Sequence, residues 1–397
     1  MKVNDIHALV NQISQMAYGE TAVVTNDLTG LIALGNTVLS SNTNKDAFLG
    51  AFVDRIGETL INSRKYTRRQ KRLLRDTFTM GAILQKLYTA PYKAVTNPKY
   101  DLEDGQSVDQ YVITKPASKQ KLFTDVNNFE IDATLWDTQL ESAFTSWEKM
   151  AAYVDSVFVA IDNTIEVELE QLENTAVANF IGEKLAYAKQ NGGLGVVNCL
   201  QQYNSDTGKT LTAAQAWTDL DFWKWFTSKY RKISKQMEKM SMLFNDEGYA
   251  RHTPSEYQVV EMHVEALEAI GSYLQADTFH NEFTAMPGSE EVIYWQGSGK
   301  GFGRTDTTTI DITTSSGVSV KQDGVIGFIH DVEAIGLMIN KPRITTSPHN
   351  GKGEYMNYFY KQELMYFNDM SENGVVFVLS DTPFVTTTPG TKSTTTK

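Results

Sequence analysis

The sequence predicts a mixed α+β protein, and three features lead to that prediction. An apolar stripe at helical spacing continues for about 45 residues from position 146. Short β-prone runs, separated by Gly- and Thr-rich turns, occupy much of the second half of the chain. A segment before the long stripe combines charged stretches with β-prone pieces. With 397 residues, 41% of them hydrophobic, the chain is long enough to bury sizeable cores.

Composition excludes several classes of protein. The net charge of −12 argues against a general nucleic-acid binder, because such affinity comes mostly from a basic surface that neutralises phosphates. Cys199 is the one cysteine and lies in an apolar run, so we expect a buried thiol in a reducing cytosol. Asp5 and His7 interrupt any signal-peptide core, and no apolar run reaches the roughly 18 residues that span a bilayer. We therefore expect a soluble protein with no membrane partner.

The first part of the chain is polar. Residues 1–44 have scattered apolar positions and are expected to form a loosely ordered arm. Phe48, Phe52 and Ile56 recur at intervals of four residues, which predicts a short helix after the arm. We assign residues 1–56 to this N-terminal arm and helix.

Residues 57–135 are expected to form an extended hairpin loop. Residues 64–75 contain seven basic residues and no acid: Arg64, Lys65, Arg68, Arg69, Lys71, Arg72 and Arg75. An acidic stretch follows at 100–109, and residues 119–135 are β-prone. In a hairpin of this kind, the end next to the body of the protein is basic and the tip is acidic. It cannot bury much apolar surface within its own chain, and isolated hairpins are marginally stable in water.

The longest predicted helix begins near Thr145, which has capping-box spacing to Glu148. It ends at Asn191-Gly192-Gly193, so it is about 65–70 Å long. The apolar stripe consists of Trp147, Met150, Val154, Val157, Phe158, Ile161, Ile165, Leu169, Leu172, Ala176 and Phe180. Four acids are expected on the other faces, where they can meet solvent or a neighbour: Glu166, Glu168, Glu170 and Glu173.

A separate α+β region is expected after the long helix. A helix beginning near Thr218 and Asp221 carries the stripe Phe222, Phe226, Tyr230, Ile233, Met237 and Met240. Thr253-Pro254-Ser255-Glu256 is a strong cap signal for another helix. Strands are expected from "GVIGFIHDVEAIGLMIN" onward, at 334–340, 355–367 and 375–380, with a loop at 343–354. Residues 386–397 are of low complexity and expected to be disordered.

Two Gly-Lys motifs invite a nucleotide-binding interpretation. Gly208-Lys209-Thr210 follows an apolar, β-prone run and precedes a helix-prone segment. However, Tyr203 occupies the leading glycine position and Asp206 places an anion where phosphate would bind, so a surface turn is favoured. The loop at 297–305 lacks the hydroxyl that a phosphate loop uses for magnesium.

The histidines are expected to be structural. His263 lies between Glu261 and Glu265, and residues two apart do not share a face if this segment is helical. His330 and Asp331 lack a third ligand cluster nearby in the sequence. We therefore predict no catalytic, cofactor-binding or metal site.

The basic run at 64–75 has two possible partners. It could contact DNA phosphates, or it could meet acidic patches on neighbouring subunits, such as Glu166 to Glu173 of the long helix. The second is favoured, because a protruding arm needs something outside its own fold to pack against. These seven basic residues and four glutamates are our candidates for contacts between subunits.

The order of these parts resembles the major capsid proteins of tailed bacteriophages, which have the Hong Kong 97-type fold. Three phrases resemble the major head proteins of small podoviruses of the phi twenty-nine type: "AFVDRIGETLI", "LESAFTSWEKMAAYVDSVFVAIDNTIEVE" and "GEYMNYFYKQELMYF". The resemblance spans nearly the whole chain. It implies that residues 57–135 form the extended loop, that 136–199 and 335–385 form a peripheral domain with its spine helix, and that 200–334 form an axial domain.

The resemblance also implies a structural function. Copies of the chain would assemble, as hexameric and pentameric capsomers, into an icosahedral or prolate head shell around double-stranded DNA. Expected partners are the chain itself, scaffolding and portal proteins, and packaged DNA, bound non-specifically on the inner face. Assembly would take place in the cytoplasm of the bacterial host. An encapsulin-like nanocompartment and a nucleotide-binding enzyme using Gly208-Lys209-Thr210 are the alternatives.

Overall fold

The computed structural model of the chain divides into two compact units. Unit 1 comprises residues 1–80, 126–173 and 337–366, and unit 2 comprises 81–125, 174–336 and 367–397. The described residues are 3–19, 22–25, 27–63, 84–124, 126–192, 194–277, 289–296, 308–314, 317–340 and 343–382.

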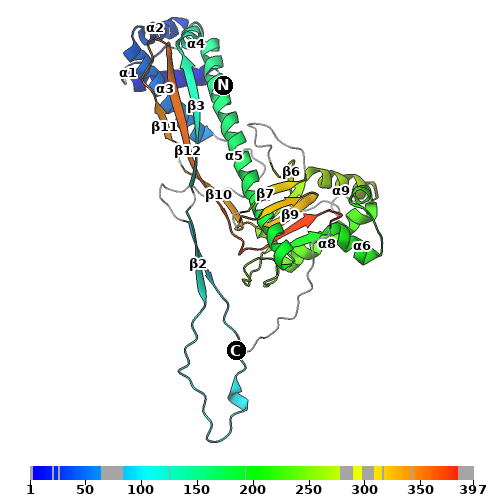
Figure 1. Ribbon diagram of the computed structural model, residues 1–397. Helices are drawn as coiled ribbons and strands as arrows, with labels where there is room; N and C mark the ends of the chain where they lie inside the picture. The colour runs from blue at the N-terminus through cyan, green and yellow to red at the C-terminus, as the bar shows by residue number, and fades with distance from the viewer. Residues whose placement is uncertain are drawn as a thin grey trace. The chain divides into compact units, whose positions relative to one another are not determined.

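The N-terminal part of unit 1 is helical, so the prediction of a loosely ordered arm is wrong. Its helices are α1 (Val3–Tyr18), α2 (Leu28–Leu39) and α3 (Asn42–Ser63), followed later by α4 (Asp137–Ala143) (Figure 1). Buried apolar side chains explain the difference: Leu9, Val10 and Ile13 of α1 and Leu31, Leu34 and Val38 of α2 share one core with Phe48 and Phe52. Asp27 caps α2 by accepting a hydrogen bond from the Gly30 amide at 2.8 Å. The helix predicted around Phe48 is confirmed as part of α3.

The sheet beside these helices has four strands. They are β3 (Val126–Trp136), β10 (Ile335–Ile339), β11 (Arg343–Thr346) and β12 (Tyr355–Asn368), in the order β10-β12-β11, with β3 also paired to β12. The β3–β12 pairing is antiparallel, from Tyr355↔Trp136 to Met365↔Val126. Residues 126–135 therefore belong to this sheet and not to the hairpin. The loop predicted at 343–354 is wrong at its start, because the β-branched run of β11 pairs with β12.

The long helix α5 (Trp147–Asn191) has 45 residues and confirms the predicted length. It ends before Gly192, which has φ +66°, as the sequence indicated. The predicted capping box between Thr145 and Glu148 is wrong, and Ser146 caps the helix instead. The Ser146 hydroxyl accepts from the Lys149 amide at 3.2 Å, whereas the Thr145 hydroxyl donates to the Ser142 carbonyl at 2.7 Å.

The predicted apolar stripe of α5 faces the core over its described side chains. The members that are buried are Trp147, Met150, Val154, Ile161, Ile165, Leu169, Ala176 and Phe180, while Val157 and Leu172 are partly buried. The side chain of Phe158 lies outside the described residues.

Unit 2 is built on a five-stranded sheet in the order β4-β13-β9-β5-β6. Its strands are β4 (Val196–Asn198), β5 (Gln258–His263), β6 (Ser289–Val292), β9 (Val325–Asp331) and β13 (Gly374–Val378). The helices of this unit are α6 (Cys199–Thr207), α7 (Ala213–Ala216), α8 (Leu220–Met237) and α9 (Val264–Asp277), and β7 (Ile310–Thr313) pairs with β8 (Ser319–Gln322). Helices α6, α8 and α9 lie beside this sheet (Figure 1). Their side chains pack with those of the sheet in one core.

Strands β9, β10, β12 and β13 confirm the predicted strands, but the helix predicted from Thr253 is wrong. The Thr253 hydroxyl donates to Asp331 Oδ2 at 2.7 Å and does not cap a helix. A single 3₁₀ turn, Ser255–Tyr257, leads directly into β5, whose six residues are all buried between β9 and β6. Pairing with two strands therefore outweighed the local cap signal.

Helix α8 confirms the predicted helix with two changes at its ends. Asp219, and not Thr218, caps it by accepting from the Phe222 amide at 2.7 Å. The helix ends at Met237, so Met240 lies beyond it and is exposed.

Candidate assembly interface

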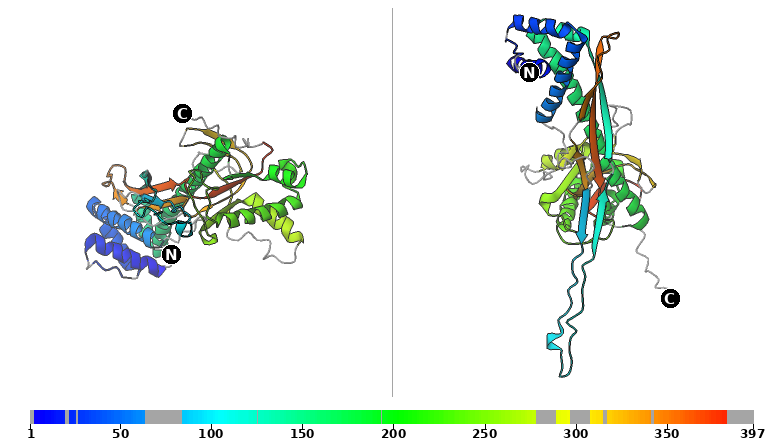
Figure 2. Two further views of the ribbon diagram at one scale, coloured as in Figure 1. Left: turned by 90° about the horizontal axis from the view of Figure 1, so that it is seen from below. Right: turned by 90° about the vertical axis from the view of Figure 1, so that its left-hand side faces the viewer.

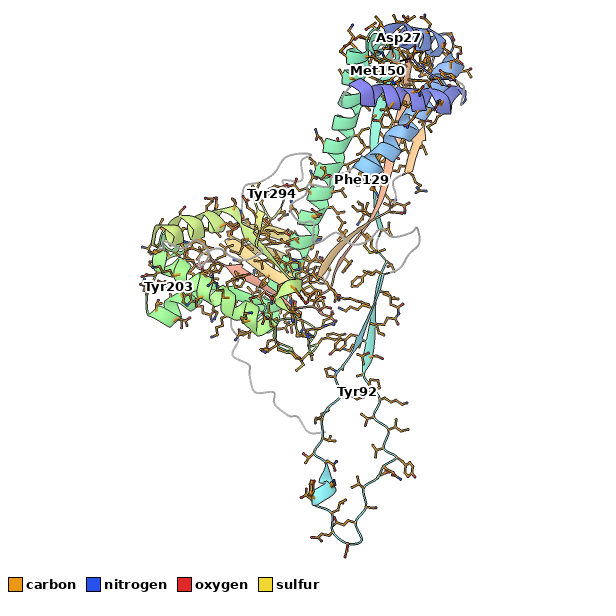
Figure 3. The ribbon with its side chains drawn as sticks, turned by 180° about the vertical axis from the view of Figure 1, so that it is seen from behind. Asp27, Tyr92, Phe129, Met150, Tyr203 and Tyr294 are labelled. Carbon is orange, nitrogen blue, oxygen red and sulfur yellow. The ribbon has the colours of Figure 1, made fainter. Side chains whose placement is uncertain are left out.

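The extended hairpin begins as a short antiparallel strand pair in unit 2. Strands β1 (Leu84–Thr89) and β2 (Ser118–Phe123) pair in register from Leu84↔Phe123 to Thr89↔Ser118. Beyond them, residues 90–117 form a long loop that contains one short 3₁₀ turn, Pro98–Tyr100 (Figures 1 and 2). Tyr92 lies just past the end of β1 (Figure 3). The predicted hairpin is thus confirmed from residue 84 to residue 123.

Two lysines that face each other across the hairpin hold one buried carboxylate. Lys86 is the register partner of Lys121, and like charges directly opposite each other destabilise a strand pair. Lys86 Nζ lies 2.8 Å from Asp369 Oδ2, and Lys121 Nζ lies 2.8 Å from Asp369 Oδ1. Asp369 has a fully buried side chain just after the end of β12. The carboxylate turns a repulsive pair into an attachment point, which we call the hairpin anchor.

Further acids and aromatic rings surround the anchor. Lys86 Nζ also lies 2.7 Å from Glu372 Oε1, and Lys121 pairs with Glu247. Arg251 pairs with Glu372 at 3.0 Å and lies over the Tyr88 ring at 4.7 Å. Tyr88 in turn meets Tyr249 edge-on, with 4.4 Å between ring centroids. These contacts attach both strands of the hairpin to the body of unit 2.

The pKa shifts identify Asp369 as the ionised centre of the anchor. Burial alone would raise its pKa, but the charge of Lys86 and the hydrogen bonds from Lys121, Lys86 and Ser371 outweigh burial and hold the pKa far below its usual range. Burial alone would lower the pKa values of Lys86 and Lys121, but their acidic partners outweigh burial and raise both pKa values. For Glu372 the balance is reversed, and burial raises its pKa despite Lys86 and Arg251.

The loop at 90–117 exposes many apolar side chains. Tyr100 is 89% exposed, and Tyr111 and Ile113 are each 81% exposed. The other large apolar side chains exposed in this loop are Tyr92, Val95, Leu102, Val108 and Val112. A firmly attached loop that leaves eight such side chains in water has the character of an interaction surface.

The structure describes the four predicted contact glutamates but not the predicted basic run. The basic run at 64–75 lies outside the described residues, so no pairing between it and the glutamates can be assigned. On α5, Glu170 is exposed, and Glu166 and Glu168 are half-buried. Glu173 is 2% exposed, so its predicted place on an outer face of the helix is wrong.

The hairpin anchor was not found from the sequence. Its lysines and Asp369 are separated by more than 240 positions along the chain. The available signal was a lysine on each of two strands that were expected to pair.

The nucleotide-binding interpretation finds no support in the geometry of Gly208-Lys209-Thr210. Strand β4 leads directly into α6, and Gly208, with φ +71°, ends that helix, so the motif follows a helix where a phosphate loop precedes one. Lys209 Nζ is bound by Asp221 at 3.0 Å and by the Tyr203 hydroxyl at 2.8 Å. These hydrogen bonds raise the pKa of Lys209. The second motif, at 297–305, lies outside the described residues.

His263 and His330 lie in the buried sheet of unit 2. His263 lies on strand β5 and not on a helix, so the helical reasoning applied to it was wrong. His330 stacks on Phe328, with ring centroids 4.6 Å apart, and its Nε2 lies 3.4 Å from Glu261 Oε1. Within the described ranges, no group of three or more His, Cys, Asp or Glu side chains could hold a metal ion.

Two further expectations concern Cys199 and the membrane. Cys199 is fully buried, and burial raises the pKa of its thiol. Over the part of the chain that the structure describes, none of the helices combines the length and the apolar character needed to cross a membrane.

Comparisons with known proteins agree on one family. The family model for Phi29-like phage major capsid proteins matches residues 6–378. The major capsid protein of Bacillus phage PZA is 24% identical over 358 residues, which cover 89% of this chain and 68% of that protein. The major capsid protein of Bacillus phage B103 is 24% identical over 187 residues, 46% of this chain and 40% of that protein.

A solved structure supports the fold. It is described as the head fiber and inner core protein gp22 of native bacteriophage P68, and one of its chains matches with a TM-score of 0.51. The match covers 78% of this chain and 84% of that chain at 11% identity, so it bears on the fold alone.

Proposed function

Because the chain belongs to the Phi29-like phage major capsid protein family, we propose that its loop at 90–117 joins neighbouring copies of the protein in a phage shell. The resemblance to tailed-phage major capsid proteins and the α+β fold class are confirmed, and the chain is a structural shell protein that assembles with itself. The nucleotide-binding enzyme and the encapsulin-like compartment are not favoured.

The observation that carries this proposal is the exposed apolar loop on a firm anchor. Fully burying one large aliphatic side chain contributes about 1.5–3 kcal/mol, so eight apolar side chains have ample free energy to gain from a partner. The anchor fixes where the loop leaves unit 2, which lowers the entropy lost on docking. A loop that docks on a different surface of the next copy makes a head-to-tail contact, and such contacts form a ring when the rotation between copies closes.

We extend the proposal to the finer organisation of the shell. The rings are hexameric and pentameric capsomers, with residues 136–199 and 335–385 as peripheral domain and 200–334 as axial domain. The basic run at 64–75 contacts Glu166, Glu168 or Glu170 of a neighbouring subunit. Scaffolding and portal proteins guide assembly in the cytoplasm of the bacterial host, the shell encloses double-stranded DNA, and the protein catalyses no reaction.

Replacing apolar side chains of the loop tests the proposal. Tyr100→Ser, Tyr111→Ser and Ile113→Ser together should leave the melting temperature of the unassembled protein unchanged, because these side chains are exposed in the single chain. The yield of particles in electron micrographs should fall at least tenfold, since a loss of about 1.4 kcal/mol per contact already gives that factor.

A matched triple variant in the same loop is the control. Ser107→Ala, Gln110→Ala and Thr114→Ala also alter exposed positions but keep every apolar side chain. This variant should assemble like the wild type. Normal particle yield in the Tyr100, Tyr111 and Ile113 variant would refute the proposed role of the loop.

A further inference from the structure

Strand β3 has one unpaired edge. All 11 of its residues pair with β12 along the other edge, from Tyr355↔Trp136 to Met365↔Val126 (Figure 1). Within the described ranges, no other strand pairs with β3. A long free edge presents a row of backbone N–H and C=O groups to which a second chain can add a strand. Proteins usually shorten or cover such edges, so the free edge of β3 is a place to look for a partner.

An apolar pocket of about 260 Å³ lies beside this edge. Its lining includes residues 131–135 of β3, Val157 and Ile161 of α5, and Tyr358 of β12. Side chains along β3 alternate between exposed and more buried positions, as in any strand with one face on a core. Because five consecutive residues of β3 line the pocket, both faces of the strand contribute to it. The pocket therefore reaches the free edge.

The loop at 90–117 contains a segment with the composition of a strand. Residues 111–115 are Tyr-Val-Ile-Thr-Lys, and aromatic and β-branched residues favour strands. All five side chains are exposed, and the segment forms no helix, strand or turn in the single chain. Pro116 follows, and its missing N–H would end a strand at this point. The segment is thus a short strand without a sheet.

We infer that residues 111–115 of a second copy add to the free edge of β3 as an antiparallel strand. Such strand addition obtains its affinity from main-chain hydrogen bonds and its specificity from alternate side chains. The inference rests on the proposed function of the loop, and it names the surface that receives the loop.

Side chains on one face specify the register of the added strand. When Lys115 lies opposite Asp132, opposite charges face each other, which stabilises a strand pair. The same register places Tyr111 opposite Trp136, and these side chains are 81% and 46% exposed in the single chain. Aromatic pairs at facing positions are also favourable. Val112 then lies on the other face of the added strand, toward the apolar pocket.

The occupant of the edge has to come from another copy. Residues 118–123 pair with β1 and residues 126–136 pair with β12, so the chain between Lys115 and Asp132 is held in two strands and cannot turn back on itself. Pairing of β3 with the β3 of a second copy is disfavoured, because Glu130 and Asp132 of both copies would lie together and like charges destabilise facing strands. The loop segment of a second copy meets neither obstacle.

An engineered disulfide tests the register. Ile113→Cys combined with Thr134→Cys places cysteines at facing positions, where Cα atoms about 4.5–5.5 Å apart are within reach of a disulfide. The native Cys199 is fully buried and should not compete. Oxidised particles of this variant should give a ladder of linked chains on a non-reducing gel. Ile113→Cys with Asn128→Cys is the control, because Asn128 lies on the same face about 20 Å along the strand, and it should remain monomeric on the gel.

Charge reversal gives an independent test without a covalent bond. Lys115→Asp should lower the yield of particles, because it places like charges opposite each other, and adding Asp132→Lys should restore the yield. Lys93→Asp makes the same change elsewhere in the loop, and Asp132→Lys should not rescue it. All three side chains are exposed in the single chain, so the melting temperature of the unassembled protein should stay unchanged in every variant.

Two outcomes would overturn the inference. The first is particles in which the Ile113→Cys, Thr134→Cys variant stays unlinked or is linked no better than the control. The second is a charge-reversed pair that assembles no better than Lys115→Asp alone. Either result would leave the proposed function standing, because that function is tested by the loss of particles in the Tyr100, Tyr111 and Ile113 variant.

Discussion

Replacing Asp369 with asparagine should release the hairpin from unit 2. The asparagine keeps the size of the side chain and an accepting oxygen, but it removes the charge that Lys86 and Lys121 share. Removing one partner of a buried ion pair costs about 3–5 kcal/mol. The lysine side chains are 21% and 29% exposed, so water stabilises them in part and the lower end, about 3 kcal/mol, is expected. That value raises the open fraction of the hairpin by about 100-fold.

Hydrogen exchange of the unassembled protein measures this opening. The amides of β1 and β2 should exchange about 100-fold faster in Asp369→Asn, while those of β9 and β13 should be little affected. Glu333→Gln is the control, because Glu333 lies 3.5 Å from Lys86 but is 60% exposed, so its loss should change the stability by only about 0–1 kcal/mol. Unchanged exchange in Asp369→Asn, or an equal increase in Glu333→Gln, would refute the role of the anchor.

The pH dependence of the anchor follows from the same pKa shifts. The lowered pKa of Asp369 contributes stability that is present above the unfolded value near about 4 and is lost as the pH falls through the folded value. The raised pKa values of Lys86 and Lys121 contribute stability that is present below about 10 and is lost as the pH rises through the folded values. Glu372 acts in the opposite direction, because its pKa is raised and its ionisation with rising pH therefore lowers the stability of the folded state. The anchor should therefore hold from about pH 5 to about pH 9.

Three further substitutions test the packing of the units. Ile165→Ala should lower the free energy of unfolding by about 2–5 kcal/mol in urea titrations, because the side chain is fully buried, and a loss below about 1 kcal/mol would contradict the assigned face of α5. Asp246→Ala should lower the free energy of unfolding by about 3–5 kcal/mol, because it leaves Lys184 buried without its partner at 3.0 Å. Adding Lys184→Met should restore at least half of that loss, whereas simple additivity of the two effects would show that the two residues do not interact. Gly324→Ala should lower the melting temperature by several degrees, because Gly324 has φ +73° and a Cβ there would collide with the Leu379 carbonyl oxygen; an unchanged melting temperature would argue against this turn.

Elements with a strong local pattern could be predicted from the sequence. Helix α5 has a long apolar stripe and a glycine just after its end, so the sequence predicted both the helix and its length correctly. Strands β12 and β13 are apolar or alternating runs bounded by turn residues, and they were found for the same reason. In each case the signal lies within the element itself.

Elements that depend on distant partners could not be predicted. Strand β5 was taken for a helix because a local cap signal preceded it, whereas two neighbouring strands determine its structure. Helix α1 was missed because polar residues surround the apolar ones of its buried face. Helix α2 was missed although its buried side chains Leu31, Leu34 and Val38 recur at helical spacing. The anchor requires Asp369 to meet Lys86 across 283 positions, and no pattern within either segment indicates that contact.

Accessibility of the loop before and after assembly tests the central claim most directly. Hydroxyl-radical footprinting would compare Tyr100 and Tyr111 in purified unassembled protein and in particles of the same chain, with Tyr257, which is 51% exposed in unit 2, as an internal reference. If the loop joins neighbouring copies, oxidation of both loop tyrosines should fall at least several-fold on assembly. Equal oxidation of the loop tyrosines in particles and in unassembled protein would contradict the claim that this loop joins the copies of the shell.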